Sequence, residues 1–235
     1  RVQLKNHHYS VILYQYSGPG TQEVADRWSL GGIRSGLGWE AYMATQGYIV
    51  ACVDGRGTGG RGEEFTKCTY MNLGVKEAQD QAETAKYFNK QSYVDNGRIG
   101  IWGWSFGGYM TIMSMSEGSN VFKAGVAVAP VTDWKFYDSV YTERFMRTPQ
   151  ENADGYAASS AFTRAGNLSG KLLIVHGMAD DNVHFQNTAE YCEQLVQSNK
   201  QFDMQVYTNR NHSIYGGNTR YHLFTRITEF FKNNL

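Results

Sequence analysis

The sequence predicts an α/β fold in which a mostly parallel sheet carries helices on both faces. Short, continuously apolar runs alternate with stretches of helical period, as expected when buried parallel strands are joined by crossover helices. Twenty-six glycines and only three prolines fit regular elements connected by glycine-rich loops. The 235 residues suit one domain whose core needs no disulfide or metal. We therefore expect residues 1–235 to form a single domain.

Each expected element has its own signal. The helix expected at 75–88 carries Val75, Ala78 and Ala82 on one face. Residues 132–170 are aromatic and polar with no clean period, so this segment is expected to be irregular and to lie on the loop side of the sheet, where α/β proteins place their sites. The other helices are expected at 105–117, 186–197 and 220–231. The strands are expected at 9–16, 48–53, 98–104, 124–129, 171–175 and 204–207.

The charge balance, the apolar runs and the cysteines of the chain argue against several kinds of partner and site. Lys and Arg number 22, as do Asp and Glu, so the formal net charge is 0, which argues against a nucleic-acid or anionic-membrane partner. No run approaches the ~18 apolar residues of a membrane span. Cys52, Cys68 and Cys192 lie far apart, which leaves either one disulfide or three free thiols and argues against a structural zinc site. The chain opens at Arg1 without a leader, so we interpret it as part of a longer or processed protein.

A serine stands in a G-x-S-x-G motif at residues 103–107. The motif follows the strand expected at 98–104 and opens a helix, which is the strand–turn–helix context of a nucleophile elbow in the α/β-hydrolase fold. Glycines on both sides allow this sharp turn to close, and the Ser105 hydroxyl would project from the sheet beside helix amides that can bind an oxyanion. The structural alternative is a helix N-cap serine, and the context favours the nucleophile.

An elbow serine requires a base and an acid, which follow it in the order acid, then histidine. Asp180 follows the fifth expected strand and His212 the sixth, so Asp180 is expected to orient the imidazole and His212 to take the proton of Ser105. Asp181 is the alternative acid because it is adjacent. The remaining histidines, for which we expect no catalytic role, are His7, His8, His176, His184 and His222.

Three runs of the chain resemble the catalytic domain of the prolyl oligopeptidase family, with its dipeptidyl-peptidase IV branch most similar. They are IWGWSFGGYM, VAVAPVTDWKFYDSVYTERFM and HGMADDNVHF, and the resemblance extends from about Tyr9 to the C-terminus. It implies an α/β-hydrolase domain and a serine peptidase that cleaves after proline or alanine. Such an enzyme forms an acyl-enzyme and releases N-terminal dipeptides, so the implied partner is a peptide with proline or alanine at the penultimate position.

The resemblance also implies roles for individual residues. Ser105, Asp180 and His212 match the nucleophile, acid and base. The Tyr16 hydroxyl and the backbone N–H of Phe106 match the oxyanion hole. Asn182 matches the side chain that holds the carbonyl of the second substrate residue, and Tyr137 also helps to hold the substrate N-terminus. The residues that match the walls of the proline pocket are Tyr137, Tyr141, Trp134, Val131 and Val183. Ordinary core packing is the alternative for these aromatic residues.

Further expectations come from the resemblance alone. Members of the family carry an N-terminal β-propeller, whose glutamates bind the substrate amino terminus in the dipeptidyl branch, and this chain is expected to be a fragment that lacks it. A homodimer through the C-terminal helices and a periplasmic or cell-surface location are implied. Neither a metal nor an organic cofactor is implied.

Three other functions compete with the peptidase. Residues 55–60 match the G-x-G-x-x-G dinucleotide fingerprint, but residues 61–70 are polar and mixed, so no helix is expected directly after it, and no acidic residue ends a following strand. A carboxylesterase or other acyl hydrolase would use the same triad with a different pocket. A chain without its propeller could also be an inactive fragment or an interaction domain.

Overall fold

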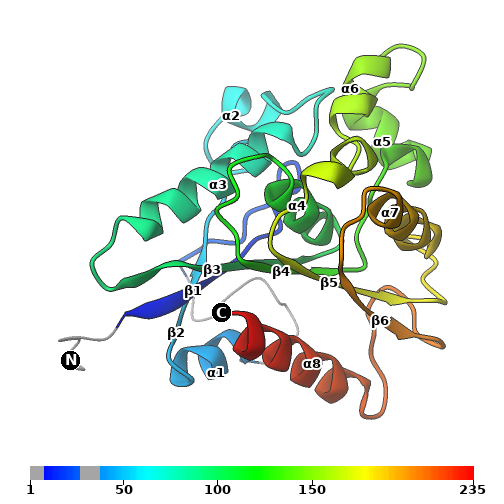
Figure 1. Ribbon diagram of the computed structural model, residues 1–235. Helices are drawn as coiled ribbons and strands as arrows, with labels where there is room; N and C mark the ends of the chain where they lie inside the picture. The colour runs from blue at the N-terminus through cyan, green and yellow to red at the C-terminus, as the bar shows by residue number, and fades with distance from the viewer. Residues whose placement is uncertain (1–7, 27–37) are drawn as a thin grey trace.

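The centre of the molecule is a parallel sheet of six strands in the order β2-β1-β3-β4-β5-β6 (Figure 1). The computed structural model describes residues 8–26 and 38–235, so the expectation for His7 lies outside the described residues. All five neighbouring strand pairs are parallel, as the sequence predicts. The strands are β1 (Tyr9–Tyr14), β2 (Tyr48–Cys52), β3 (Val94–Trp104), β4 (Ala124–Val128), β5 (Lys171–Gly177) and β6 (Asp203–Tyr207).

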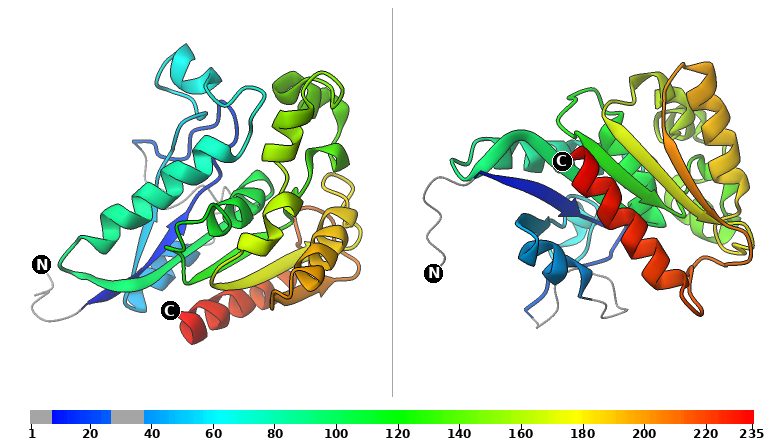
Figure 2. Two further views of the ribbon diagram at one scale, coloured as in Figure 1. Left: turned by 45° about the horizontal axis from the view of Figure 1, so that its top comes forward. Right: turned by 60° about the horizontal axis from the view of Figure 1, so that its bottom comes forward.

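Helices cover both faces of the sheet (Figures 1 and 2). One face carries α3 (Val75–Asn89), α4 (Phe106–Met115) and α7 (Gln186–Gln197), and the other carries α1 (Trp39–Thr45) and α8 (Thr219–Asn234). Alternate residues of the strands belong to two separate clusters, because successive side chains of a strand point to opposite faces. On β1, for example, Val11 packs in the α4-side cluster and Ile12 in the α8-side cluster. The predicted two-sided burial of the sheet is confirmed.

The segment 132–170 differs from the expectation of irregular chain. It contains two short 3-10 helices, η1 (Trp134–Phe136) and η2 (Phe162–Asn167), and two α-helices, α5 (Ser139–Met146) and α6 (Ala153–Ala158). Side chains cap the N-termini of both α-helices. Asp138 accepts a hydrogen bond from the Tyr141 N–H at 2.8 Å, and Asn152 accepts one from the Gly155 N–H at 3.2 Å. These helices are too short to show a helical period in the sequence, which needs a window of about 11 residues or more.

Two other short helices were not expected. The helix α1 buries Trp39 and Met43, and α2 (Glu63–Lys67) lies just beyond the glycine-rich loop 55–60. The expectation that no helix directly follows this loop is therefore wrong. The helix was missed because α2 buries no residue, so the sequence shows no apolar pattern there. Its five residues do not pack against the sheet as a nucleotide-binding helix would.

Several smaller points complete the fold. Strand β1 ends at Tyr14, so residues 15–17 form a loop rather than the end of a strand. Strand β3 begins at Val94, four residues earlier than expected. The three cysteines are free thiols and half-buried. Among the described residues, no helix combines the length and the apolar character that crossing a bilayer would require.

Candidate active site

The nucleophile candidate occupies a strained turn between β3 and α4. Ser105 has φ 61° and ψ −118°, a backbone conformation that a non-glycine residue adopts only when its surroundings impose it. The Ser105 N–H donates to Val128 O on β4 at 2.8 Å, and its carbonyl accepts from the Tyr109 N–H at 3.0 Å. These bonds hold the turn from the neighbouring strand and from the first turn of α4.

The glycines around Ser105 are required by close backbone contacts. A Cβ atom added at Gly103 or at Gly107 would lie 2.5 Å from the Gln15 carbonyl oxygen, and one at Gly108 would lie 2.6 Å from Val128 O. Both distances are far shorter than a carbon–oxygen contact permits. The side-chain amide of Gln15 also donates a hydrogen bond to Gly107 O at 2.7 Å. The loop after β1 is therefore packed directly against the elbow.

Asp180 and His212 are joined by a hydrogen bond. His212 Nδ1 lies 2.7 Å from Asp180 Oδ2, with the carboxylate fully buried and the imidazole 20% exposed. Asp180 Oδ1 accepts the backbone N–H groups of Asn182 and Val183, each at 2.9 Å. Asp181, the alternative acid, is exposed. The structure thus brings Asp180, and not Asp181, to His212.

The environment of Asp180 keeps its carboxylate ionised. Burial by itself raises the pKa of Asp180, but hydrogen bonds from His176 and His212 and from the Asn182 N–H outweigh burial and hold this pKa well below its usual range. An ionised carboxylate at this position accepts the Nδ1 proton of His212 and leaves Nε2 as the basic nitrogen.

The histidine loop lies beside the elbow. The Trp104 indole N–H donates to the His212 carbonyl at 2.9 Å, which fixes the loop next to the residue that precedes Ser105. The Arg220 guanidinium stacks over the Trp104 ring at 5.0 Å. Within the described residues, no hydrogen bond joins the Ser105 hydroxyl to the His212 ring; such catalytic bonds are often long until substrate binds.

Tyr16 and Phe106, which the resemblance matches to the oxyanion hole, both lie next to Ser105. The Tyr16 hydroxyl interacts with the Ser105 side chain; burial and the charge of Glu23 raise the Tyr16 pKa, and the bond with Ser105 lowers it. Phe106 is the first residue of α4, so its N–H has no acceptor within the helix. The Tyr16 and Phe106 rings lie 6.0 Å apart. At Gly18 a Cβ atom would lie 2.5 Å from the Tyr16 ring, so the glycine leaves room for this tyrosine.

An aromatic cluster adjoins the elbow. Trp134 lies 5.5 Å from Phe106, is stacked on Tyr141 at 6.0 Å and 18°, and meets Tyr137 edge-on at 6.0 Å. Tyr137 and Tyr141 are half-buried, whereas Trp134 is buried. Val131 and Val183, the other residues matched to the pocket by resemblance, are both buried. The cluster therefore offers flat apolar walls with two partly accessible tyrosines.

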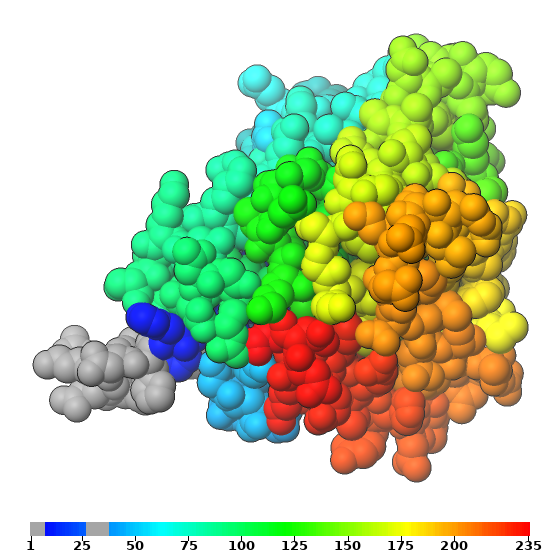
Figure 3. Space-filling view, in the orientation of Figure 1, coloured from blue at the N-terminus to red at the C-terminus, as the bar shows by residue number. Residues whose placement is uncertain are grey.

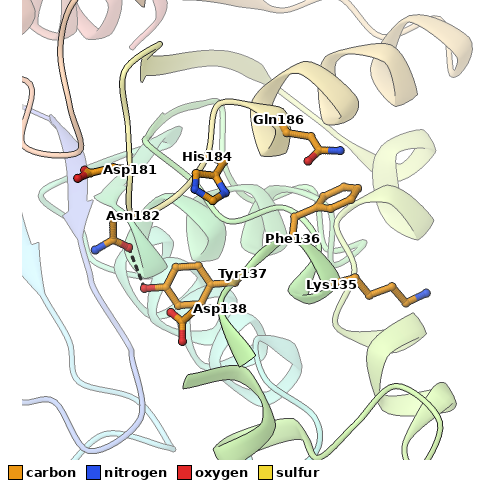
Figure 4. A pocket seen from close by; sticks show the side chains of 8 residues that line it. All are labelled: Lys135, Phe136, Tyr137, Asp138, Asp181, Asn182, His184 and Gln186. Atoms are coloured by element: carbon orange, nitrogen blue, oxygen red, sulfur yellow. Dashed lines mark hydrogen bonds between the residues drawn. The ribbon is translucent and has the colours of Figure 1, made fainter. Parts of the chain in front are cut away.

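A cavity of about 650 Å³ lies between the β5–α7 loop and the segment of η1 and α5 (Figure 4). The Tyr137 hydroxyl donates to Asn182 Oδ1 at 2.8 Å across it. His184, which we expected to be structural, is exposed and lines the cavity. The remaining lining residues are Lys135, Phe136, Asp138, Asp181 and Gln186.

Sequence reasoning also missed a contact inside the site. His176 Nε2 lies 3.1 Å from Asp180 Oδ2. Its four-residue separation from Asp180 was visible in the sequence, but nothing in a single sequence shows that the two side chains face each other. In the described parts of the chain, no group of three or more His, Cys, Asp or Glu side chains is arranged to hold a metal ion.

Comparisons with known proteins identify the family to which the chain is similar. Residues 36–235 match the model of the prolyl oligopeptidase family. A probable dipeptidyl-aminopeptidase B of Coccidioides posadasii is 44% identical, covering 96% of this chain and 24% of that protein. Dipeptidyl peptidase 4 of Felis catus is 42% identical, covering 95% of this chain and 29% of that protein.

Solved structures give the same result. The crystal structure of Porphyromonas gingivalis dipeptidyl peptidase 4 is 61% identical with a TM-score of 0.93, covering 97% of this chain and 32% of that one. A putative dipeptidyl aminopeptidase IV from Bacteroides ovatus is 39% identical with a TM-score of 0.91, covering 97% of this chain and 32% of that one. This likeness confirms the predicted α/β-hydrolase fold. The chain spans about a quarter to a third of the length of these relatives.

Proposed function

The chain belongs to the prolyl oligopeptidase family, and we propose that it is a serine peptidase domain that cleaves peptide bonds after proline or alanine and releases N-terminal dipeptides. The observation that carries this proposal is the 2.7 Å bond between His212 Nδ1 and the buried Asp180 carboxylate, beside Ser105 in its strained turn. The names of the relatives support the dipeptidyl activity.

In this mechanism the Ser105 hydroxyl attacks the substrate carbonyl while His212 Nε2 takes its proton. Asp180 keeps the other proton of the ring on Nδ1 and stabilises the imidazolium. The Tyr16 hydroxyl and the Phe106 N–H donate to the oxyanion of the tetrahedral intermediate. His212 then gives its proton to the leaving amine, and the acyl-enzyme forms. Water, deprotonated by His212, releases the acyl group and restores Ser105.

The aromatic cluster supports a preference for proline or alanine. Trp134, Tyr137 and Tyr141 present rigid apolar walls, against which a ring-locked proline packs at little entropic cost. Asn182 Oδ1 is already occupied by the Tyr137 hydroxyl, so the NH₂ of Asn182 is the end that can donate to a substrate carbonyl. A bulkier residue in place of proline would meet the buried Val131 and Val183.

The resemblance supports two further proposals. Acidic residues of a propeller outside this chain would bind the substrate amino terminus. A homodimer would form through α8, which lies along the surface beside α1 (Figure 3). Tyr221 on α8 is 80% exposed and borders a groove between these two helices. Sedimentation of the Tyr221→Asp variant would test the dimer, and an unchanged dimer would argue against this surface.

The activity itself is tested with Gly-Pro-p-nitroanilide and a fluorophosphonate probe, on the protein at its full natural length. We expect cleavage and labelling by the wild type, and loss of labelling with at least a ~10⁴-fold loss of kcat/KM in Ser105→Ala. The control Ser198→Ala, at the far end of α7, should match the wild type. Cleavage of p-nitrophenyl esters without Gly-Pro cleavage would indicate an esterase instead, and an absence of labelling would indicate an inactive domain.

A further inference from the structure

A second histidine contacts the triad acid. His176 lies near the end of β5 and its ring is completely buried. Its Nε2 atom is 2.8 Å from the Val183 carbonyl oxygen and 3.1 Å from Asp180 Oδ2. Asp180 Oδ2 therefore has two imidazole nitrogens against it, one from His176 and one from His212.

The partners of His176 determine its tautomer. A carbonyl oxygen and an ionised carboxylate only accept hydrogen bonds, so Nε2 of His176 carries a proton and donates it to both. Nδ1 lies 2.7 Å from Thr188 Oγ1. In a neutral ring with Nε2 protonated, Nδ1 is an acceptor, so the Thr188 hydroxyl donates to it. A donor chain thus leads from Thr188 on α7 through His176 to Asp180.

We propose that His176, held in its Nε2–H tautomer by the Val183 carbonyl and Asp180 and kept in orientation by the Thr188 hydroxyl, is a positioning residue that fixes Asp180 and limits how strongly Asp180 holds the protonated form of His212. This inference rests on the proposed function, because it acts through the same triad. The frame is rigid: Thr188 is buried in α7, and the Phe185 ring packs edge-on against His176 at 5.6 Å. No atom of His176 touches substrate in this mechanism.

The physical effect follows from a shared acceptor. With two N–H donors on Oδ2, the negative charge of Asp180 is divided between His176 and His212. If the His176 donor is lost, Oδ2 interacts with His212 alone and stabilises its protonated form more strongly. The base then needs a higher pH to become free, and the acid limb of the pH–rate profile moves upward.

Among the described residues, the titratable side chains hydrogen-bonded to Asp180 are His176 from β5 and His212 from the β6–α8 loop. Burial raises the pKa of Tyr137, beyond η1, and the Asp180 charge adds to the rise; Asp181 is adjacent and exposed. From α7, the group that faces His176 is the hydroxyl of Thr188, which does not titrate. A shift of the acid limb in a variant at Thr188 or His176 therefore reports the state of Asp180 and His212.

The test compares matched pairs of variants in the protein at its full natural length. Thr188→Val removes the donor to Nδ1 with little change of volume, and Thr188→Ser keeps it. His176→Leu removes the donor to Asp180, and His176→Gln keeps an N–H at the position of Nε2. The readouts are the pH dependence of kcat/KM for Gly-Pro-p-nitroanilide and of the second-order rate of fluorophosphonate labelling. Thr84→Val, whose hydroxyl donates to Asp80 O within α3, is the control.

We expect the acid-side midpoint to rise by about 0.5 pH unit or more in Thr188→Val and His176→Leu. It should stay within ~0.2 unit of the wild type in the Ser, Gln and control variants. Midpoints that coincide with the wild type in Thr188→Val would overturn the inference, even if this variant unfolds at a lower temperature. If His176→Leu does not fold, the Thr188 pair still decides the question.

The two proposals can fail separately. If the wild type is labelled by the fluorophosphonate but does not cleave Gly-Pro, the dipeptidyl activity is wrong, and the labelling profiles still test His176. If the wild type is not labelled at any pH, the triad does not operate and both proposals fall. If Gly-Pro is cleaved and all profiles coincide, only the positioning role of His176 is wrong.

Discussion

Asp180 and Asp181 are adjacent in the chain and have opposite surroundings. The Asp180 carboxylate is fully buried and accepts N–H groups from Asn182, Val183, His176 and His212. The Asp181 side chain is exposed at the edge of the cavity. Only the first of these carboxylates can fix an imidazole tautomer, because only it is buried and hydrogen-bonded to imidazole nitrogens.

Replacement of each aspartate by asparagine should therefore have very different effects. An amide at position 180 presents an NH₂ to His212 or to His176 and favours the wrong tautomer, so we expect kcat of Asp180→Asn to fall by about 10³–10⁴-fold. Asp181→Asn should change kcat by less than about threefold, because the side chain is exposed. Steady-state kinetics on a dipeptidyl substrate measures both, and the reverse ranking would show that the acid is misassigned.

At the scale of the element, the turn between β3 and α4 depends on atoms that belong to another strand. The loop after β1 places the Gln15 carbonyl where a side chain at Gly103 or Gly107 would lie. The same loop continues into Tyr16, which reaches the Ser105 side chain. The elbow and Tyr16 are thus positioned by one contact, between the loop after β1 and α4.

The variant Gly107→Ala tests this contact. Its new Cβ atom would lie 2.5 Å from Gln15 O, so the β1 loop and α4 must separate. We expect a loss of about 1–3 kcal/mol in the free energy of unfolding, together with lower activity because Tyr16 moves with the loop. Urea denaturation measures the stability. The control Gly166→Ala adds a Cβ atom with no neighbour within 4 Å, and equal stability of the two variants would argue against the contact.

At the scale of the whole molecule, the parallel arrangement brings the candidate residues together. β3, β5 and β6 all end at the same edge of the sheet, and the chain after them carries Ser105, Asp180 and His212 in turn. β1 ends at that edge too, and Tyr16 lies in the loop that follows it. The layers that support this edge include α3, in which Glu77 is completely buried.

Glu77 should make the stability of the molecule depend on pH. Burial, offset in part by the backbone N–H groups of Glu77 and Gly74, raises the Glu77 pKa from 4.5 to about 8. Between these two values the native state holds a proton that the unfolded chain has lost, so stability falls as pH rises from about 5 to 8. In Glu77→Gln this dependence should disappear. From pH 5 to pH 9, the wild type should therefore lose about 3 kcal/mol or more of its free energy of unfolding relative to the variant.

Thermal or urea unfolding across pH 5–9 measures this difference. Glu83→Gln lies on the exposed side of the same helix and should follow the wild-type curve. Parallel stability curves for Glu77→Gln and the wild type would show that Glu77 is already ionised in the native state.

Much of the fold could be predicted from the sequence because it rests on local patterns. The apolar runs of β1 to β6 and the helical period of α3 and α7 are properties of neighbouring residues. The order of Ser105, Asp180 and His212 after successive strands also predicted one shared edge, although their catalytic roles remain a proposal. The helices α1, α2, α5 and α6 could not be predicted, because none exceeds eight residues and so short a stretch shows no helical period.

The order of amino acids is enough to show which residues can form strands, where the elbow turn lies and which side chains can do acid–base chemistry. It takes the folded chain to show that Asp180 rather than Asp181 meets His212, that His176 shares the same oxygen, and that Tyr16 reaches Ser105. These contacts join residues up to 89 positions apart, from Tyr16 to Ser105. Their distances depend on how the strands align and how the helices pack on them, which no local pattern of residues specifies.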